Sequence, residues 1–305
     1  MTVQIFRSTP SFDFLGKRWI GFALSIALTL GSLGLVAVKG LNLGIDFTGG
    51  ILLEVHSEKA VDLAGLRTAL SQGEFGEISL QNSGSEQDVM IRIQVSKEND
   101  QAKTTEEVKS LIAQLIPDVD FRKIDYVGPT VGEELIRGGI IATLLSFAAI
   151  MAYVWFRFEW QYGVGAILAL IHDSIMILGF FAITRFEFGL TSVAAILTII
   201  GYSINDSVVI YDRIRENMRR FKKMPVMELL NTSINETLSR TILTASTTLL
   251  ASLALYLFGG PVIEGFSAAM VFGVLIGTYS SIYISAPTLL YLNIRGSETE
   301  LAVQA

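Results

Sequence analysis

Six long apolar stretches constrain the fold of this 305-residue chain. A helix needs about 20 mostly apolar residues to cross a hydrocarbon core about 30 Å thick. The stretches that come close to this length, none with more than one charged side chain, are Trp19–Val38, Gly138–Phe156, Gly163–Thr184, Phe188–Tyr211, Thr241–Phe258 and Phe266–Leu290. The chain is therefore predicted to be a polytopic α-helical membrane protein with six transmembrane helices.

The composition excludes several classes of protein. Charged residues make up 17% of the chain, against about 25% in a typical soluble protein, which excludes an intrinsically disordered chain. Because the chain has no cysteine, it cannot contain a disulfide scaffold, a thiol nucleophile or a cysteine-ligated metal site. Its net charge of −6 argues against a nucleic-acid-binding protein.

Lysine and arginine in the short loops predict the orientation, because they concentrate on the cytoplasmic side. They lie before the first stretch and after the second, fourth and last, whereas the opposite short loop holds only Arg185. Residues 1–18 and 293–305 are thus expected in the cytoplasm, with helix 1 at 19–38 and helices 2–6 within 138–292. Helix 1 is too long for a signal peptide and is not followed by a small-residue cleavage site, so we expect a retained anchor.

Residues 39–137 form a second region, which this topology places on the side of the membrane opposite the cytoplasm. The region holds 17 acidic and ten basic residues. Strand-like runs such as Val89–Val95 alternate with helix-like runs such as Asp62–Leu70 in the order βαββαβ, which predicts a ferredoxin-like α+β domain. The region contains no cluster of histidine and carboxylate residues and no glycine-rich phosphate loop, so we expect a binding or mechanical module.

The loop after the fourth stretch is predicted to form two short amphipathic helices within residues 212–239. Ile214, Met218 and Phe221 share one face of the first helix, and the second can open at Pro225. One interpretation is an interfacial helix pair that lies on anionic lipid. The alternative is a docking site for a cytoplasmic partner.

Asp206 is the leading candidate functional residue, because an ionisable group inside a span is costly and usually functional. It lies in a polar segment of the fourth stretch, with Ser203, Asn205 and Ser207 as polar support. Arg240, at the cytoplasmic end of the fifth stretch, is the candidate cation. An acid that alternates between a paired, charged form and an unpaired, protonated form can carry protons; the alternative is a static buried ion pair that fixes helix packing.

Asp173 is a second candidate for proton transfer, with His172 beside it near the middle of the third stretch. Adjacent residues point about 100° apart on a helix, so we do not expect these two side chains to pair. A hydrogen-bonded buried histidine without a relay function is the alternative for His172. Hydroxyl and glycine residues in the last two spans, among them Gly273, Gly277 and Ser280, favour close helix packing.

The energy source is expected to be an ion gradient, since the sequence has neither a Walker A pattern nor G-x-G-x-x-G. No cofactor and no enzymatic activity are expected, and the sequence leaves open whether the coupling ion is H⁺ or Na⁺. One charge that crosses a potential of about 150 mV releases roughly 3.5 kcal/mol. This free energy can bias a conformational equilibrium a few hundredfold.

Several motifs resemble the SecD/SecF protein-export family of the resistance–nodulation–division superfamily. They are Leu43-Gly44-Ile45-Asp46-Phe47-Thr48-Gly49-Gly50, Val127-Gly128-Pro129-Thr130-Val131-Gly132, Phe156-Arg157-Phe158-Glu159-Trp160, Gly201-Tyr202-Ser203-Ile204-Asn205-Asp206-Ser207, Asp212-Arg213-Ile214-Arg215-Glu216-Asn217 and Phe258-Gly259-Gly260-Pro261-Val262. They follow the family order along nearly the whole chain.

The resemblance implies a subunit of the bacterial inner membrane that pairs with SecD and works beside the SecYEG channel. The proton motive force would drive translocation and release of preproteins, and YajC is a further candidate partner. The family's transport carboxylate falls on Asp206 and its arginine on Arg240. Asp46, Gly49 and Gly50 either form a turn that starts the first strand or form a hinge between helix 1 and the external domain.

Two other functions fit the same sequence. The chain could be a half-transporter of small molecules or lipids, although one external domain of about 100 residues is small for a drug exporter. It could also be a passive subunit that stabilises the translocon and moves no ions. The sequence leaves open the coupling ion, the number of ions moved, the matching partner residues and the contact with preprotein.

Overall fold

The computed structural model describes residues 10–295, apart from 74, 77, 83–84 and 94–100. The chain divides into two compact units. The helical unit is built from residues 1–42, 142–186 and 191–305, and the sheet unit from residues 43–141 and 187–190. The ends of the predicted termini, residues 1–9 and 296–305, lie outside the described residues.

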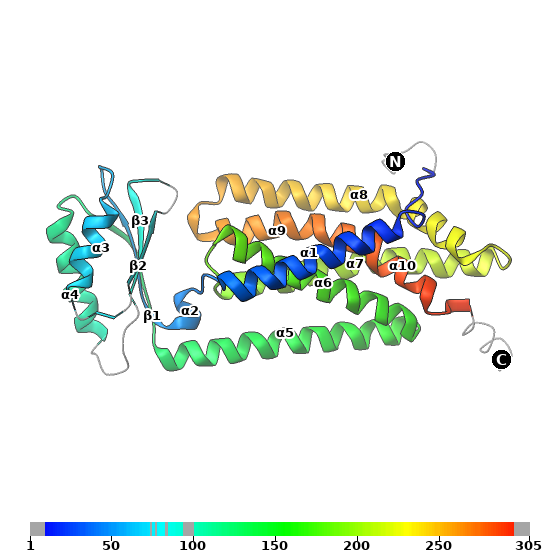
Figure 1. The fold of residues 1–305 in the computed structure, drawn as a ribbon, viewed down its shortest axis with the longest axis horizontal. Coiled ribbons are helices and arrows are strands. Elements are labelled where there is room, and N and C mark those ends of the chain that lie inside the picture. Colours follow the sequence, from blue (N-terminus) through cyan, green and yellow to red (C-terminus); the bar gives the residue numbers. More distant parts are fainter. Residues whose placement is uncertain (1–9, 74, 77, 83–84, 94–100, 296–305) are drawn as a thin grey trace. The chain divides into compact units, whose positions relative to one another are not determined.

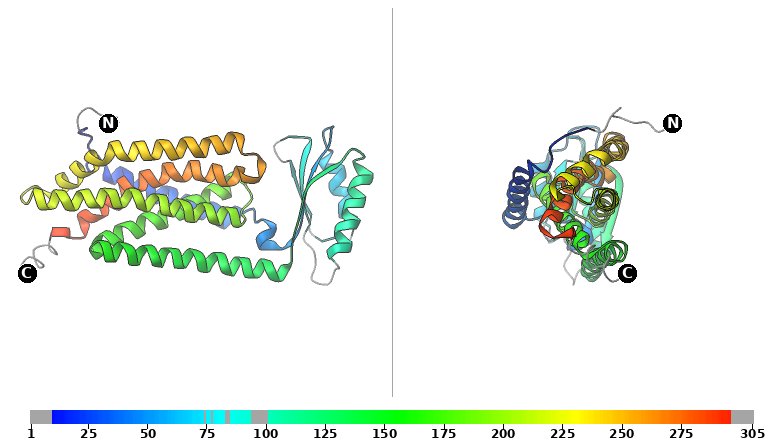
Figure 2. Two further views of the ribbon diagram at one scale, coloured as in Figure 1. Left: turned by 180° about the vertical axis from the view of Figure 1, so that it is seen from behind. Right: turned by 90° about the vertical axis from the view of Figure 1, so that its right-hand side faces the viewer.

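Six helices of the described chain are long and apolar enough to cross a membrane. They are α1 (Arg18–Lys39), α5 (Pro129–Arg157), α6 (Trp160–Thr184), α7 (Leu190–Arg220), α8 (Val226–Phe258) and α9 (Pro261–Ser280). Helices α8 and α9 run side by side (Figures 1 and 2). A π-helical turn, η1 (Ser281–Ser285), follows α9 and leads into α10 (Ala286–Thr288) and a 3₁₀ turn, η2 (Leu289–Tyr291).

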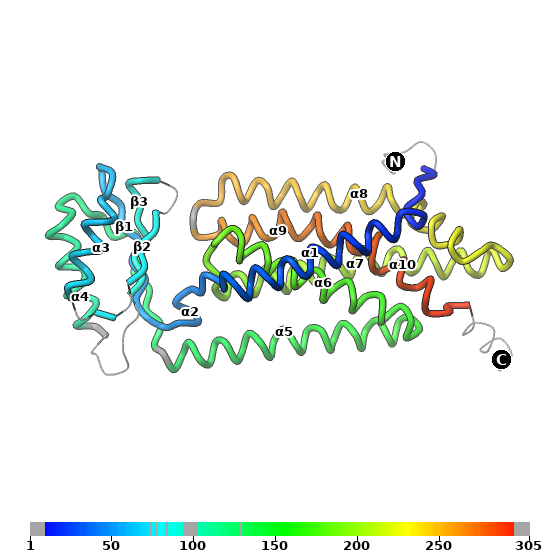
Figure 3. The backbone as a smooth tube through the Cα atoms, viewed as in Figure 1, coloured from blue at the N-terminus to red at the C-terminus, as the bar shows by residue number. Residues whose placement is uncertain are grey.

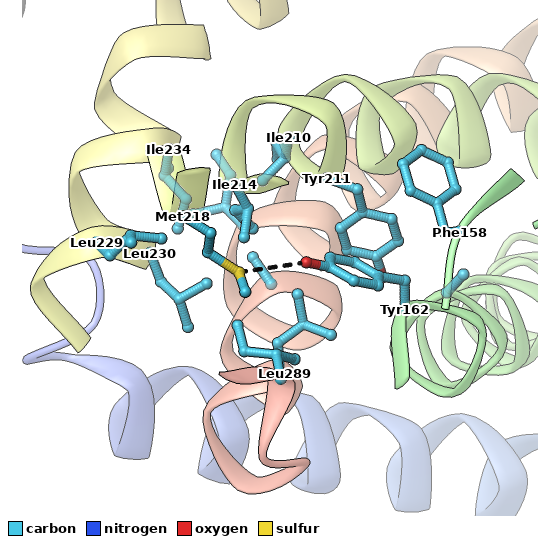
Figure 4. Close-up of a cluster of buried hydrophobic side chains, with 14 of the residues drawn as sticks. Phe158, Tyr162, Ile210, Tyr211, Ile214, Met218, Leu229, Leu230, Ile234 and Leu289 are labelled. Atoms are coloured by element: carbon cyan, nitrogen blue, oxygen red, sulfur yellow. Dashed lines mark hydrogen bonds between the residues drawn. The ribbon is translucent and has the colours of Figure 1, made fainter. Parts of the chain in front are cut away.

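The two predicted short amphipathic helices are not separate, because α7 and α8 each continue without a break beyond the apolar spans; the predicted start of the second helix at Pro225 is confirmed, since this residue caps α8. A turn at residues 221–225 joins α7 and α8 (Figure 3). Ile214 and Met218 of the predicted apolar face pack inside the helical unit with Phe158, Tyr162 and Tyr211, together with Leu229, Leu230 and Ile234 of α8 (Figure 4). Leu238 belongs to the same cluster. Burial of this stripe stabilises the hairpin at about 25 cal/mol per Å² of apolar surface.

Polar side chains also hold α7 against α8. Arg213 Nε lies 2.6 Å from Glu236 Oε2 across the two helices. The amide of Asn217 donates to the same carboxylate at 2.6 Å and to Ser233 Oγ at 3.0 Å. Asn217 and Ser233 are buried, so these bonds satisfy groups that would otherwise be costly to bury. They fix the register of the two helices that carry Asp206 and Arg240.

The sheet unit has the predicted element order βαββαβ. Its elements are α2 (Ile45–Thr48), β1 (Gly50–His56), α3 (Leu63–Ser71), β2 (Ile78–Asn82), β3 (Asp88–Ile93), α4 (Gln101–Leu115) and β4 (Asp120–Val127). The strands pair antiparallel in the order β2-β3-β1-β4. Helices α3 and α4 lie on one face of this small sheet (Figure 1). Alternate strand residues such as Ile51, Leu53 and Ile91 are buried with the helix residues Leu66 and Ile112, as a period of two requires.

Candidate functional site

The polar residues at positions 203–207 of α7 point in different directions, because successive residues on a helix are 100° apart. Ser203, Asp206 and Ser207 are buried, whereas Asn205 is exposed. None of the three residues predicted as polar support makes a hydrogen bond to Asp206 among the described residues. Asp206 therefore faces α8, while Ser203 and Ser207, one turn apart, face other helices.

Asp206 is held by a neutral partner on α8. Its side chain is only 3% exposed, and its Oδ1 accepts a 3.0 Å hydrogen bond from the hydroxyl of Thr241. Its Oδ2 has no hydrogen-bond partner in the described part of the chain. A buried carboxyl group with a single hydroxyl donor is only partly compensated for the water that it loses on burial.

Arg240 is the residue just before Thr241, so Asp206 lies beside the turn of α8 that carries the predicted cation. Arg240 is exposed. Over the residues that the structure describes, no hydrogen bond or ion pair joins it to Asp206. The two helices thus share a layer, and the guanidinium acts on the acid electrostatically without forming an ion pair with it.

More polar groups border Asp206. Tyr202, one turn earlier on α7, lies near Thr244 of α8 and Thr278 of α9. The hydroxyls of Tyr202 and Thr278 are buried. Three helices therefore contribute polar atoms to one buried region around a single carboxyl group.

Asp173 on α6 forms a second buried cluster. The residue is fully buried, and its Oδ2 accepts hydrogen bonds from Ser203 at 2.6 Å and from Ser280 at 2.8 Å. His172 Nδ1 lies 3.0 Å from Asp173 Oδ1, so the expectation that these two neighbours do not pair is wrong. Their Cβ atoms do diverge by about 100°, but the imidazole ring is long enough to turn back to the carboxyl group.

A line of hydroxyl groups continues from this cluster along α7. The hydroxyls of Ser207 and Ser281 are 3.1 Å apart, and the hydroxyl of Tyr211 is hydrogen-bonded to that of Ser285. Both partners on the last helix belong to the π-helical turn η1, and such turns are frequent at functional sites. Polar contacts thus join α7 to η1 over two helical turns.

Sequence reasoning missed Thr241, Ser280 and Ser281 as polar partners. Their only signal was the abundance of hydroxyl residues in the last two spans, which was interpreted as close packing. That interpretation holds for Gly277, where an added Cβ would lie 3.1 Å from the Cβ of Ser203. The residues that bind Asp173 and Asp206 are far away in sequence, so helix periodicity alone could not identify them.

The motif predicted to be a turn or a hinge, which contains Asp46, Gly49 and Gly50, lies in the sheet unit. Asp46 belongs to the one-turn helix α2, and Gly49 and Gly50 are buried and adopt φ angles of 69° and 121°. Only glycine takes such angles without strain. The motif therefore turns the chain from α2 into β1, and the carboxylate of Asp46 accepts a hydrogen bond from the backbone of Leu190.

Comparison with known proteins places these residues in a family. Residues 107–295 match the family described as "Protein export membrane protein SecD/SecF, C-terminal", and residues 34–61 match the "SecD/SecF GG Motif". The protein translocase subunit SecF of Rickettsia bellii is 52% identical over 279 residues, which cover 91% of this chain and 92% of the relative. The corresponding subunit of Rickettsia prowazekii is 52% identical over 293 residues, or 95% and 94% of the two chains.

Two solved structures have the same fold. SecDF from Thermus thermophilus, a translocon-associated membrane protein, matches with a TM-score of 0.86 and 36% identity over 94% of this chain and 39% of that chain. SecDF in a super-membrane-facing form matches with a TM-score of 0.71 and 35% identity, and the match covers 99% of this chain and 41% of that chain. The chain thus spans about two fifths of the solved SecDF chains. On these identities and coverages, the chain belongs to the SecD/SecF family of protein-export membrane proteins.

Proposed function

We propose that this chain is a subunit of the Sec protein-export machinery that uses the proton motive force to drive preprotein translocation and release. In this proposal Asp206 carries the proton and Arg240 is its alternating charge partner. The observation that carries the proposal is the geometry of Asp206: among the described residues its buried carboxyl group has one neutral donor, and Arg240 acts on it electrostatically without an ion pair.

The physical argument is a two-state equilibrium. When Arg240 contacts Asp206, the cation compensates the buried negative charge. When Arg240 is turned away, the ionised form loses that compensation, and the acid is better accommodated with a proton. A proton that binds from one side and leaves to the other links these two arrangements to the gradient. Na⁺ is the alternative coupling ion.

Asp173 and His172 are proposed as a second proton-transfer pair. The cluster at Asp173 shares α7 with Asp206, through Ser203. Within the part of the chain that the structure describes, Asp173 has three hydrogen-bond partners, whereas Asp206 has one. We therefore rank Asp206 as the main carrier and Asp173 as the supporting group.

The partners follow from the family and from the uncovered helices. We propose that SecD supplies further helices against this chain, with SecYEG, YajC and the moving preprotein as additional partners. Helix α5 supports this assignment because most of its apolar residues, among them Ile140, Leu144, Leu145 and Phe156, are exposed in the chain alone. Large apolar surfaces of this kind mark contacts with lipid or with partner helices.

We also propose that the chain resides in the bacterial inner membrane with both termini in the cytoplasm. The basic loops support this orientation. The sheet unit would then be a ferredoxin-like periplasmic domain that moves against, or binds, the emerging polypeptide.

The experiment is export of a preprotein into vesicles that contain the whole complex, with and without a proton gradient. Asp206→Asn should remove the stimulation by the gradient while the complex remains assembled. Asn205→Ser, which changes an exposed neighbour on the same helix, is the matched control and should export normally. Full stimulation in Asp206→Asn would contradict the proposal and favour the passive subunit.

A further inference from the structure

The turn before β1 holds the first residue of helix α7. Oδ2 of Asp46 accepts a 2.8 Å hydrogen bond from the backbone N–H of Leu190, and α7 runs from Leu190 to Arg220. The first N–H groups of a helix have no partner within the helix, and an aspartate that accepts from one of them stabilises the helix end. Such a cap normally comes from the residue just before the helix, whereas this one comes from 144 positions away.

Two glycines make room for this contact. A Cβ on Gly189 would lie 2.6 Å from Oδ2 of Asp46, and a Cβ on Gly44 would lie 2.5 Å from Oε1 of Glu187. Between these positions the N–H of Gly44 donates to the carbonyl of Phe188 at 3.0 Å. A larger residue at Gly189 would therefore displace the carboxylate of Asp46, and one at Gly44 would displace the side chain of Glu187.

The sheet itself holds the same segment. Arg92 of β3 forms a 2.8 Å ion pair with Glu187, and the arginine side chain is buried. In the strand register Arg92 pairs with Leu52, so it lies on the sheet face opposite Ile91 and Ile93 of the core. Segment 187–190 is thus attached to the sheet unit by a helix cap, a backbone bond and an ion pair.

We propose that Asp46 is a positioning residue for ion coupling: it ties α7 to the sheet unit, so that α7 transmits movement between that unit and Asp206. Helix α7 contains no proline, which suits it to act as a strut. Asp206 lies 16 residues beyond Leu190, about 24 Å at 1.5 Å per residue. This inference rests on the proposed function, since it assigns a mechanical route to the same carboxyl group.

The test compares Asp46→Ala, Asp46→Asn and Gly189→Ala in the assembled complex in vesicles. The readout is the ratio of export with a proton gradient to export without one. We expect the ratio to fall toward one in Asp46→Ala and in Gly189→Ala, with unchanged export in the absence of the gradient. Asp46→Asn should retain most of the ratio, because its amide oxygen can accept the same hydrogen bond. Gly138→Ala, where an added Cβ has nothing within 4 Å, is the control.

A wild-type ratio in Asp46→Ala would overturn the inference, and so would an Asn variant as defective as the Ala variant. Should Asp46→Ala fail to assemble, the ratio in Gly189→Ala decides. Amide hydrogen exchange at Leu190 gives a second readout that does not depend on the gradient, and it should become faster in Asp46→Ala but not in Asp46→Asn.

The two proposals can fail separately. Normal stimulation of export by the gradient in Asp206→Asn would contradict the proposed function. Amide hydrogen exchange at Leu190 would still report whether Asp46 caps α7. Faster exchange in Asp46→Ala together with normal stimulation would overturn the coupling role of Asp46 and leave the function of Asp206 intact.

Discussion

Thr241 donates a hydrogen bond to Asp206 from the position that directly follows Arg240 on α8. This neutral bond holds the carboxyl group on the side of α7 that faces the cation-bearing turn. Loss of the bond would leave a buried oxygen without its partner, at a cost of about 1–3 kcal/mol. The contact therefore makes Thr241 a testable part of the site.

Thr241→Val should reduce gradient-driven export about tenfold, because the carboxyl group loses its donor and its fixed orientation. Thr241→Ser retains a hydroxyl and should preserve most of the activity. Export into energised vesicles measures both variants. Equal activity of the Val and Ser variants would show that the hydrogen bond has no role.

Arg240→Met should be about as defective as Asp206→Asn, since either change removes one member of the alternating pair. Arg240→Lys retains a positive charge and should keep part of the stimulation. Gradient-driven export is again the measurement, with export in the absence of the gradient as the internal reference. A Met variant that exports normally would exclude Arg240 as the partner.

Asp173→Asn should impair stimulated export less than Asp206→Asn, because the amide can still accept from Ser203 and Ser280. Removal of one donor has a different effect: Ser203→Ala leaves an oxygen of a fully buried carboxyl group with one hydroxyl partner fewer. We expect a loss of about 1–3 kcal/mol of stability, measured by thermal unfolding in detergent. If Asp173→Asn proves the more damaging aspartate substitution, the ranking of the two acids is reversed.

Gly165→Ala should destabilise the helical unit. An added Cβ would lie 2.8 Å from the carbonyl oxygen of Ser285 and 2.8 Å from the hydroxyl of Tyr211, and overpacking of this kind costs about 1–3 kcal/mol. Gly163→Ala, two residues earlier on α6, has nothing within 4 Å of its new Cβ and should be neutral or slightly stabilising. Thermal unfolding should therefore occur at a lower temperature in Gly165→Ala but not in Gly163→Ala, and an equal decrease in both variants would contradict the packing.

Asp88 should make the stability of the sheet unit depend on pH. The hydroxyl of Ser85 lowers the pKa of Asp88 below its ordinary value of 3.8, opposed by partial desolvation and aided by His56 and Arg122. A carboxyl group with a lowered pKa in the folded state stabilises the fold above its unfolded pKa, and this contribution is lost as the pH falls through the folded value.

The wild-type chain should therefore lose protection from hydrogen exchange in β3 as the pH falls below about 4. Asp88→Asn should lose less of it over the same interval, because it has no carboxyl group to protonate at that position. Identical pH dependence in the two proteins would show that Asp88 makes no such contribution.

The sequence predicted the six apolar helices and the βαββαβ order because both follow from local periodicity. It did not predict how far α7 and α8 extend, since the same apolar stripe suits either a lipid surface or a protein core. Residues Ile214 and Leu230 belong to that core, and only tertiary packing distinguishes the two outcomes.

The candidate site was predictable in part. Asp206 and Asp173 are prominent in the sequence because a charge within an apolar span is rare. Their hydrogen-bond partners were not predictable, since Thr241 and Ser280 resemble many other hydroxyl residues of the last two spans. The cap between Asp46 and Leu190 joins segments 144 positions apart, and no local pattern contains such a contact.

Segment 187–190 has a practical consequence for anyone who isolates the sheet unit. A soluble fragment cut from residues 43–141 would leave four residues of its own compact unit behind. Arg92 would then lose Glu187, and Asp46 would face bulk water instead of Leu190. A fragment in which a linker adds residues 187–190 should be more stable, and so more suitable for binding and crystallographic work, than residues 43–141 alone.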